Sequence, residues 1–254
     1  MIEYIIKEDN GYNYVEIGEG APLILLHGLF GALSNWQAVI ENFSKSYKVV
    51  VPLLPIYDLP ILNTNVSALA KFLHGFLTFK KFSDVILLGN SLGGHVALVY
   101  TLEHPEFVKG LVLTGSSGLY ENSFGGSFPK RESYDYVQER VGYTFYNPHT
   151  ATKELVDEVY ATVNDRNKVM RILAMAKSAI RHNMRKELSK ISQPTCLIWG
   201  KQDTITPPEV AEDFRTLIPK SELHWIEQCG HAPMMEHSAQ FNVILTDFLN
   251  RVLA

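Results

Sequence analysis

The sequence has only two cysteines, and it has no apolar stretch that approaches the ~20 residues of a membrane span. Cys196 lies inside an apolar run and Cys229 in a predicted loop, so a disulfide framework is not indicated and a reducing compartment is expected. The first residues include Glu3 and no long apolar run, which is not the pattern of a targeting segment. We therefore expect a cytoplasmic protein without a membrane partner.

A strongly basic charge balance is also missing. The formal net charge is -4 at pH 7, and no dense run of lysine and arginine offers an electrostatic footprint for nucleic acid. The patterns His-Glu-x-x-His, Cys-x-x-Cys, Gly-x-Gly-x-x-Gly and Gly-x-x-x-x-Gly-Lys-Ser/Thr do not occur. We expect no metal, no cofactor and no nucleic acid, and a small-molecule substrate as the partner.

The chain is long and apolar enough to bury a sizeable core. With 254 residues, 46% of them hydrophobic, it fits one large domain or a domain with an insertion. Short apolar runs alternate with segments of helical periodicity, which predicts an α/β fold with a mostly parallel sheet. The expected strands are 12–17, 23–26, 48–53, 84–88, 108–113, 195–199 and 222–226, and the expected helices are 36–43, 66–76, 93–103, 209–217 and 239–252.

The alternation breaks once, over residues 118–188. This stretch has no convincing strand, but the runs KELVDEVYATVN and RNKVMRILAMAKSAI carry helical apolar stripes. We predict a helical cap, or lid, inserted into a core formed by residues 1–117 and 189–254, with the Gly- and Ser-rich segment 115–127 as its hinge. The alternative is that these helices only stabilise the fold.

A candidate nucleophile follows the predicted strand 84–88. Gly89, Ser91 and Gly93 form Gly-x-Ser-x-Gly between a strand and a helix, and so many glycines indicate a turn too tight for Cβ atoms. This strand–turn–helix context lifts a serine hydroxyl out of the backbone at the edge of the sheet where α/β proteins bind ligands. A plain glycine-rich turn is the alternative.

A serine hydroxyl needs a base and an orienting acid. His231 lies in a loop after the predicted strand 222–226, and Asp203 follows the strand 195–199. Their order along the chain, Ser91, Asp203, His231, is the one found with the nucleophile elbow. Glu121, which follows the strand 108–113, is an alternative acid, but it lies in the predicted hinge. Cys229 is an alternative nucleophile, but it has no partner motif.

Three other histidines fit the base less well. His95 lies on the helix after the candidate nucleophile, where packing or capping is its expected role. His224 lies within an alternating strand, and His237 lies at a predicted helix start. None of them combines a preceding strand end with a glycine-rich loop.

Attack on a carbonyl also requires N–H donors for the developing oxyanion. The main-chain N–H of Leu92 lies at a helix N-terminus beside the serine. The loop after strand 23–26 offers the N–H of Leu29 as a second donor, with Phe30 as the neighbouring alternative. We expect His27 to shape this loop and not to act as a base.

With these residues assembled, the whole chain resembles the α/β-hydrolase family. The resemblance rests on His-Gly-x-x-Gly from His27, Gly-Asn-Ser-Leu-Gly-Gly from Gly89, Gly-Lys-Gln-Asp ending at Asp203, and Cys-Gly-His ending at His231. It implies the α/β-hydrolase fold with a helical cap. Within the family, the motifs look most like hydrolases that cleave carbon–carbon bonds in meta-cleavage products, with esterases close behind.

Two features depart from the family's pattern. The stretch PLLPIYDLP, residues 52–60, lacks the glycines that many members carry after the third strand. Meta-cleavage hydrolases also tend to have an aromatic residue just after the histidine and a cap arginine for the substrate carboxylate. Here Ala232 follows His231, and no cap arginine is assigned to that role.

The expected function is hydrolysis of a small carboxylic ester or similar acyl compound through an acyl-enzyme. Ser91 would attack, His231 would transfer the proton, Asp203 would orient the histidine, and the N–H groups of Leu29 and Leu92 would form the oxyanion hole. The main alternative is carbon–carbon cleavage of a vinylogous diketone. A non-catalytic ligand-binding protein, and a lyase or cofactor-free halogenating enzyme, remain alternatives because fold alone does not imply activity.

Overall fold

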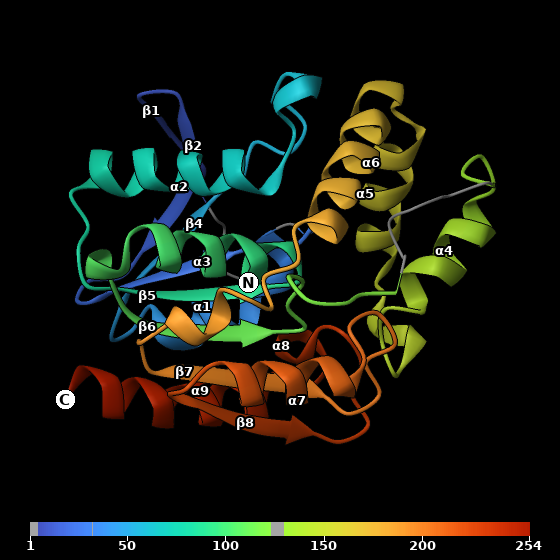
Figure 1. Cartoon of the computed structure of the whole chain (residues 1–254). Coiled ribbons are helices and arrows are strands. Elements are labelled where there is room, and N and C mark those ends of the chain that lie inside the picture. The colour runs from blue at the N-terminus through green and yellow to red at the C-terminus, as the bar shows by residue number, and fades with distance from the viewer. Residues whose placement is uncertain (1–4, 32, 123–129) are drawn as a thin grey trace.

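A single sheet runs through the molecule with helices on both of its faces (Figure 1). The computed structural model describes residues 5–31, 33–122 and 130–254. The strand order is β1-β2-β4-β3-β5-β6-β7-β8. The strands are β1 Lys7–Asp9, β2 Tyr12–Ile17, β3 Pro22–Leu26, β4 Lys48–Pro52, β5 Val85–Asn90, β6 Val108–Thr114, β7 Thr195–Gly200 and β8 Ser221–Ile226. Strands β3 to β8 pair in parallel, whereas β1 and β2 are antiparallel, so the predicted mostly parallel sheet is confirmed.

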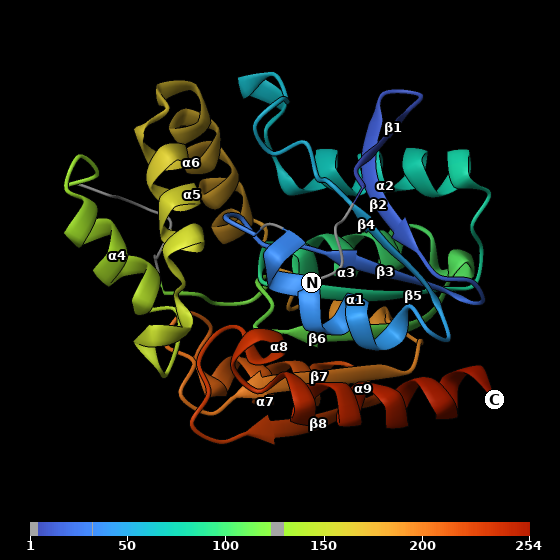
Figure 2. The same ribbon diagram turned by 180° about the vertical axis from the view of Figure 1, so that it is seen from behind.

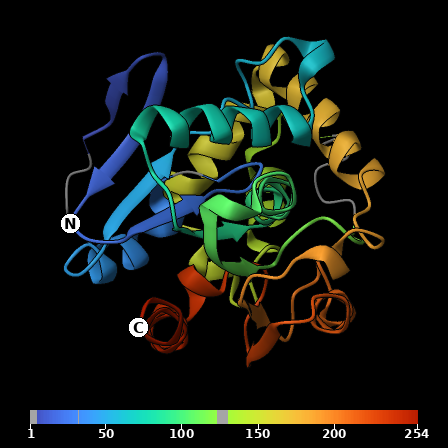
Figure 3. The same ribbon diagram turned by 60° about the vertical axis from the view of Figure 1, so that its left-hand side comes forward.

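Two helical layers cover this sheet. One face carries α1 Gln37–Phe43 and α9 Ser238–Leu253, with the short α8 Pro233–Glu236 beside them (Figure 2). The other face carries α2 Val66–Lys80, α3 Leu92–Glu103 and α7 Pro208–Leu217, and Figure 3 shows the sheet between the two layers. Short 3₁₀ helices lie at Leu33–Trp36, Ile61–Asn63, Pro105–Phe107, Pro148–Thr150 and Leu188–Lys190.

Strands β3 to β7 read as continuous apolar runs because both of their faces are buried. In β3, Ile24 and Leu26 belong to the apolar core under α2 and α3, whereas Leu23 and Leu25 belong to the core under α1 and α9. All four side chains are fully buried. The two cores hold the central strands rigidly, so the loops at their carboxyl ends start from fixed positions.

The break in the alternation corresponds to helices between β6 and β7. They are α4 Tyr134–Gly142, α5 Lys153–Asn164 and α6 Arg166–Arg181, and they lie at one end of the sheet (Figure 1). The side chains of Ser133, Thr152 and Asp165 accept hydrogen bonds from main-chain N–H groups and cap the three helices in turn. The predicted hinge 115–127 lies partly outside the described residues.

The structure adds elements that the sequence patterns did not predict. Strand β1 forms a hairpin with β2, and all of its residues are exposed. Helix α4 was not singled out from the pattern. Among the described helices, none has the length and apolar character to cross a bilayer.

Candidate active site

The candidate nucleophile lies in a strained turn between β5 and α3. Ser91 has φ 53° and ψ -120°, a conformation that costs a non-glycine residue free energy and recurs at functional sites. A Cβ on Gly93 would lie 2.0 Å from the main-chain oxygen of Leu26, and one on Gly89 would lie 2.5 Å from the carbonyl carbon of Gly93. Glycine is therefore required for the close approach of α3 to the sheet.

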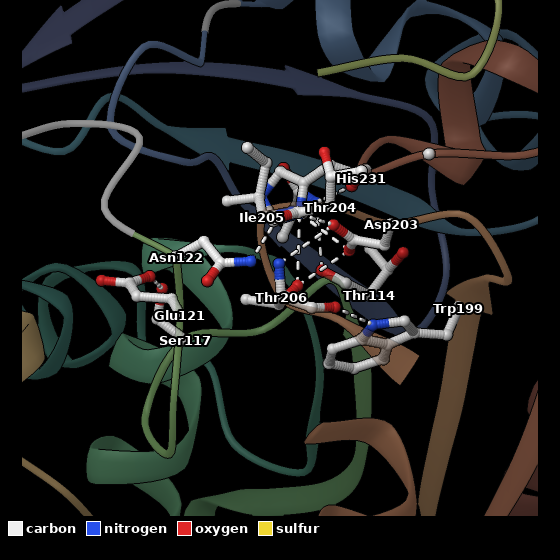
Figure 4. Close-up of polar contacts among 12 residues, drawn as sticks. Thr114, Ser117, Glu121, Asn122, Trp199, Asp203, Thr204, Ile205, Thr206 and His231 are labelled. Atoms are coloured by element: carbon white, nitrogen blue, oxygen red, sulfur yellow. Dashed lines mark hydrogen bonds and ion pairs between the residues drawn. The ribbon is translucent and has the colours of Figure 1, made fainter. Parts of the chain in front are cut away.

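The candidate acid is held by its own loop, directly after β7. Asp203 is 3% exposed, and its Oδ1 accepts hydrogen bonds from the N–H groups of Ile205 at 2.8 Å and Thr206 at 3.0 Å. The Thr206 hydroxyl donates to Oδ2 at 2.8 Å. The indole N–H of Trp199 donates to the main-chain oxygen of Thr206 at 2.8 Å, which fixes the loop to β7 (Figure 4).

The candidate base lies against this acid. Nδ1 of His231 is 2.9 Å from Oδ2 of Asp203, and the histidine is 6% exposed (Figure 4). Burial lowers the pKa of His231, but the charge and hydrogen bond of Asp203 outweigh it, and the pKa is raised above its usual value. A hydrogen on Nδ1 that is donated to Asp203 leaves Nε2 as the proton acceptor.

Two polar residues at the site were not assigned a role from the sequence. Asn90 donates through Nδ2 to the main-chain oxygens of Thr114, at 3.0 Å, and His231, at 3.1 Å. It therefore ties the histidine loop to the central sheet. Thr206 lies with Oγ1 3.2 Å from Nδ1 of His231, besides its bond to Asp203. The sequence offers only one signal for this role, the position of Thr206 three residues after the acid.

One cavity brings the predicted site residues together. Ser91, His231, Leu29 and Leu92 all line it, and Asp203 lies behind the histidine. Within the described residues, the N–H groups of Leu29 and Leu92 donate no hydrogen bond to another protein group. Both are thus available for an oxyanion, but Phe30 also lines the cavity and stays the alternative. Most other lining side chains are apolar, several of them from α4, α5 and α6: Val141, Leu155, Val159, Met175, Ala176 and Ala179.

The alternative residues occupy other environments. Glu121 accepts a hydrogen bond from the hydroxyl of Ser117 at 2.5 Å, and among the described residues it forms no hydrogen bond with His231. Cys229 is fully buried, and burial raises the pKa of its thiol, so a thiolate is disfavoured. Nε2 of His27 accepts from the N–H of Leu54 at 3.0 Å, which fits its predicted structural role. His95 is buried and does not line the cavity.

Among the described residues, one group of potential metal ligands lies elsewhere. The ligand atoms of Cys196, Glu222 and His224 lie within 4.8 Å of one another on β7 and β8. The guanidinium group of Arg251 pairs with both oxygens of Glu222 and would have to be displaced by a cation. The three residues do not line the cavity that contains Ser91.

The comparisons with known proteins agree with the fold. A family model described as "alpha/beta hydrolase fold" matches residues 21–183 and 167–238. An α/β hydrolase from a sediment metagenome of the Mar Chica lagoon in Morocco is similar in structure, with a TM-score of 0.81 and 48% sequence identity over 97% of this chain and 98% of that one. A meta-cleavage product hydrolase from Pseudomonas fluorescens, 24% identical over 95% of each chain, has a TM-score of 0.85 and shows the shared fold.

Curated relatives with similar sequences are named as hydrolases of 2-hydroxymuconate semialdehyde and of a 2-hydroxy-6-oxo-dienoic acid. The chain is 30% identical to 2-hydroxy-6-oxo-6-(2'-aminophenyl)hexa-2,4-dienoic acid hydrolase of Metapseudomonas resinovorans, over 94% of this chain and 87% of that protein. It is 28% identical to 2-hydroxymuconate semialdehyde hydrolase of Pseudomonas sp. (strain CF600), over 93% of this chain and 89% of that protein. These names favour the carbon–carbon alternative of the sequence analysis over its ester reading.

Proposed function

This chain belongs to the α/β hydrolase family, and from that premise we propose that it is a serine hydrolase of small carboxylic esters. We propose further that the part of the ester bound in the cavity carries no carboxylate. The observation that carries the proposal is the shared cavity, in which a strained serine and a histidine paired with a buried aspartate meet apolar walls. This combination suits attack on an uncharged carbonyl compound.

The proposed mechanism follows from the site residues. Ser91 Oγ attacks the ester carbonyl while Nε2 of His231 takes the hydroxyl proton, and Asp203 stabilises the imidazolium through Nδ1. The carbonyl oxygen becomes negative between the N–H groups of Leu29 and Leu92. The intermediate collapses as His231 returns the proton to the leaving alcohol, and an acyl-enzyme remains on Ser91. Water then attacks the acyl group while His231 takes a proton from it. His231 returns that proton to Ser91 Oγ as the carboxylic acid is released.

We propose that residues 118–188 act as a cap over this cavity. The support is that side chains of α4, α5 and α6 line the cavity together with loops of the sheet. The main-chain N–H of His231 also donates to the oxygen of Thr144 at 2.9 Å, so the segment after α4 contacts the catalytic loop directly. The cap would therefore exclude water and shape the substrate pocket.

The charge of the cavity favours an ester over a dienoate. No lysine or arginine lines it among the described residues, and the segments 1–4, 32 and 123–129 contain neither residue type. The only acidic side chain in the described lining is Glu121. A dienoate carboxylate buried in this cavity would lack a cationic partner, which is costly.

Carbon–carbon hydrolysis is the second candidate, favoured by the names of the relatives. The same serine, histidine and oxyanion donors can serve a vinylogous diketone, because that reaction also passes through an attacked carbonyl. The two candidates differ in the substrate's carboxylate, which the dienoic acid of one relative's name includes.

The test compares both substrate classes on the same protein samples. We would measure release of p-nitrophenol from short acyl esters, and bleaching of a 2-hydroxy-6-oxo-dienoate, with wild type, S91A, H231A and the exposed-serine control S46A. The proposal predicts ester turnover that falls by about 10³-fold or more in S91A and H231A and is unchanged in S46A. Bleaching of the dienoate without ester turnover would establish the second candidate. Turnover of neither, with no labelling of Ser91 by a fluorophosphonate, would favour a ligand-binding protein.

A further inference from the structure

We propose that Glu121 is the specificity-determining residue of the cavity, and that it selects esters bearing a cationic group over neutral and anionic ones. The inference rests on the proposed ester hydrolysis and deepens it by naming the substrate class. It comes from the placement of one carboxylate between the catalytic cavity and a second, adjoining cavity.

The main chain around Glu121 is fixed to the loop of the candidate acid. The next residue, Asn122, donates through its main-chain N–H to the oxygen of Ile205 at 2.7 Å. Its side-chain Nδ2 donates to the oxygen of Thr204, also at 2.7 Å (Figure 4). Glu121 is therefore carried on the same loop system as Asp203 and keeps a fixed distance from the catalytic residues.

The carboxylate itself is fixed to the nucleophile turn. Oε2 of Glu121 accepts from Oγ of Ser117 at 2.5 Å, and Ser117 is 2% exposed (Figure 4). The main-chain N–H of Ser117 donates to the oxygen of Ser91 at 3.1 Å. Two hydrogen bonds of Ser117 thus link the carboxylate to the residue that would carry the acyl group.

Glu121 also stands where two cavities meet. It lines the catalytic cavity and a second one, and Asn122, Ala179 and Ile180 line both as well. Gly118, Leu119, Tyr120 and Asn183 complete the second cavity, which lies between the two chain segments that connect the cap helices to the core. A substrate group that extends from Ser91 toward this opening passes the carboxylate.

The charge of Glu121 is not neutralised locally. No lysine or arginine forms an ion pair with it among the residues that the structure describes. Burial raises the pKa of Glu121 above its usual value, and the hydrogen bond from Ser117 and the charge of His231 offset only part of that rise. Beside apolar walls, an ionised carboxylate attracts a cation and repels an anion more strongly than it would in water.

The test uses three acetate esters of similar size whose alcohol groups differ in charge. They are acetylcholine (cation), 3,3-dimethylbutyl acetate (neutral) and 2-sulfoethyl acetate (anion). A second trio carries the same charges at the end of the acyl chain, because either half of the ester can face the carboxylate. The variants are E121Q, which keeps an oxygen that can accept from Ser117, and the control E212Q, which removes the same charge from an exposed position on α7.

For wild type and E212Q, we expect kcat/KM for at least one trio to fall by about tenfold at each step from cation to neutral to anion. In E121Q the three values should converge to within about threefold. Equal charge preference in wild type and E121Q would overturn the inference.

A binding measurement separates this inference from the proposed function. If wild type hydrolyses no ester, the proposal of ester hydrolysis is wrong. The inference about Glu121 is then decided by calorimetric titration of acetylcholine into S91A and into S91A/E121Q. About tenfold weaker binding to the double variant supports the role of Glu121 without any turnover. Equal affinities would reject it independently of the chemistry.

Discussion

At the scale of single residues, the histidine–aspartate pair depends on a third side chain, Thr206. Its hydroxyl donates to Oδ2 of Asp203 at 2.8 Å, on the oxygen that also bonds His231. A hydrogen bond to a charged group contributes more than one between neutral groups. Thr206 is therefore a positioning residue for the pair.

Removing this hydroxyl while keeping the side-chain shape should lower activity. We expect T206V to reduce kcat for a p-nitrophenyl ester by about tenfold, because Asp203 loses a donor that holds its orientation. T206S retains the hydroxyl and should stay within about threefold of wild type. Steady-state kinetics check this, and equal kcat in wild type and T206V, with equal melting temperatures, would contradict it.

With His231 as the proposed base, its raised pKa predicts how acylation depends on pH. The histidine acts as a base only when neutral, so the acylation rate rises with pH as its proton is lost. Because Asp203 raises the pKa above the ordinary histidine value of about 6.5, the midpoint of this rise should lie above that pH. Rates of fluorophosphonate labelling against pH give the midpoint. A midpoint below the ordinary value would contradict the assignment, and D203N should move it downward.

At the scale of elements, the site depends on how closely α3 approaches the sheet. Gly93 lies against the main chain of Leu26, where no side-chain rotation can make room for a Cβ. The same contact places the N-terminus of α3, and thus the N–H of Leu92, beside the loop that begins at His27. Helix packing and the position of the Leu92 N–H, a proposed oxyanion donor, therefore depend on one glycine.

We expect G93A to lower the free energy of unfolding by about 3 kcal/mol or more, because backbone must move to relieve the overlap. The control G11A has open space around its Cβ but a φ of +78°, and it should cost only about 1 kcal/mol. Urea unfolding of the three proteins tests this. Equal losses for the two variants would show that the close approach is not what requires glycine.

The core elements could be predicted from the sequence because their burial is periodic. Strands β3 to β7 are buried enough to read as apolar runs, whereas β8 alternates, and α5 carries its apolar residues on one stripe. Strand β1 escaped prediction because all of its side chains are exposed and its pairing with β2 is set by the hairpin. Local pattern carries no signal for such an element.

The candidate site could be predicted where it follows local rules. Ser91, Asp203 and His231 each lie just beyond a strand end, and the topology brings such loops to one edge. The roles of Asn90 and the pairing of Ser117 with Glu121 could not be predicted. They depend on side-chain directions within the folded turns, which no spacing along the chain specifies.

At the scale of the whole molecule, a histidine pair joins α3 to the segment after α6, and thus the sheet layer to the proposed cap. Nε2 of His95, on α3, lies 3.0 Å from Nδ1 of His182, directly after α6, and the rings stack. Nearby, the N–H of Met184 donates to the oxygen of Gly118 at 2.8 Å, so the two connecting segments are bonded to each other. Burial, with His182 adding to it, lowers the pKa of His95 to about 3.

This low pKa makes the fold less stable in acid. An unfolded histidine takes up a proton near pH 6.5, whereas folded His95 stays neutral down to about 3, so the unfolded state binds more protons between these values. The contribution of His95 to the free energy of unfolding is therefore complete above about pH 6.5. It falls as the pH is lowered, by about 2 kcal/mol at pH 5.

Chemical unfolding at about pH 7.5 and about pH 5 tests the contribution of His95. The loss of unfolding free energy between the two should be about 2 kcal/mol smaller in H95Q than in wild type. H149Q, which changes an exposed histidine, should lose as much as wild type. An unchanged pH dependence in H95Q would show that protonation of His95 does not limit acid stability.

The most direct test of the central claim, a serine that carries the acyl group, is the pre-steady-state burst of p-nitrophenol. Mixing excess p-nitrophenyl ester with wild type should release about one equivalent per protein chain in a fast phase, followed by slower turnover, when deacylation limits the rate. S91A should show no burst and a rate lower by about 10³-fold or more. A burst of equal size in S91A would contradict the account, because the acyl group would then be carried by another residue.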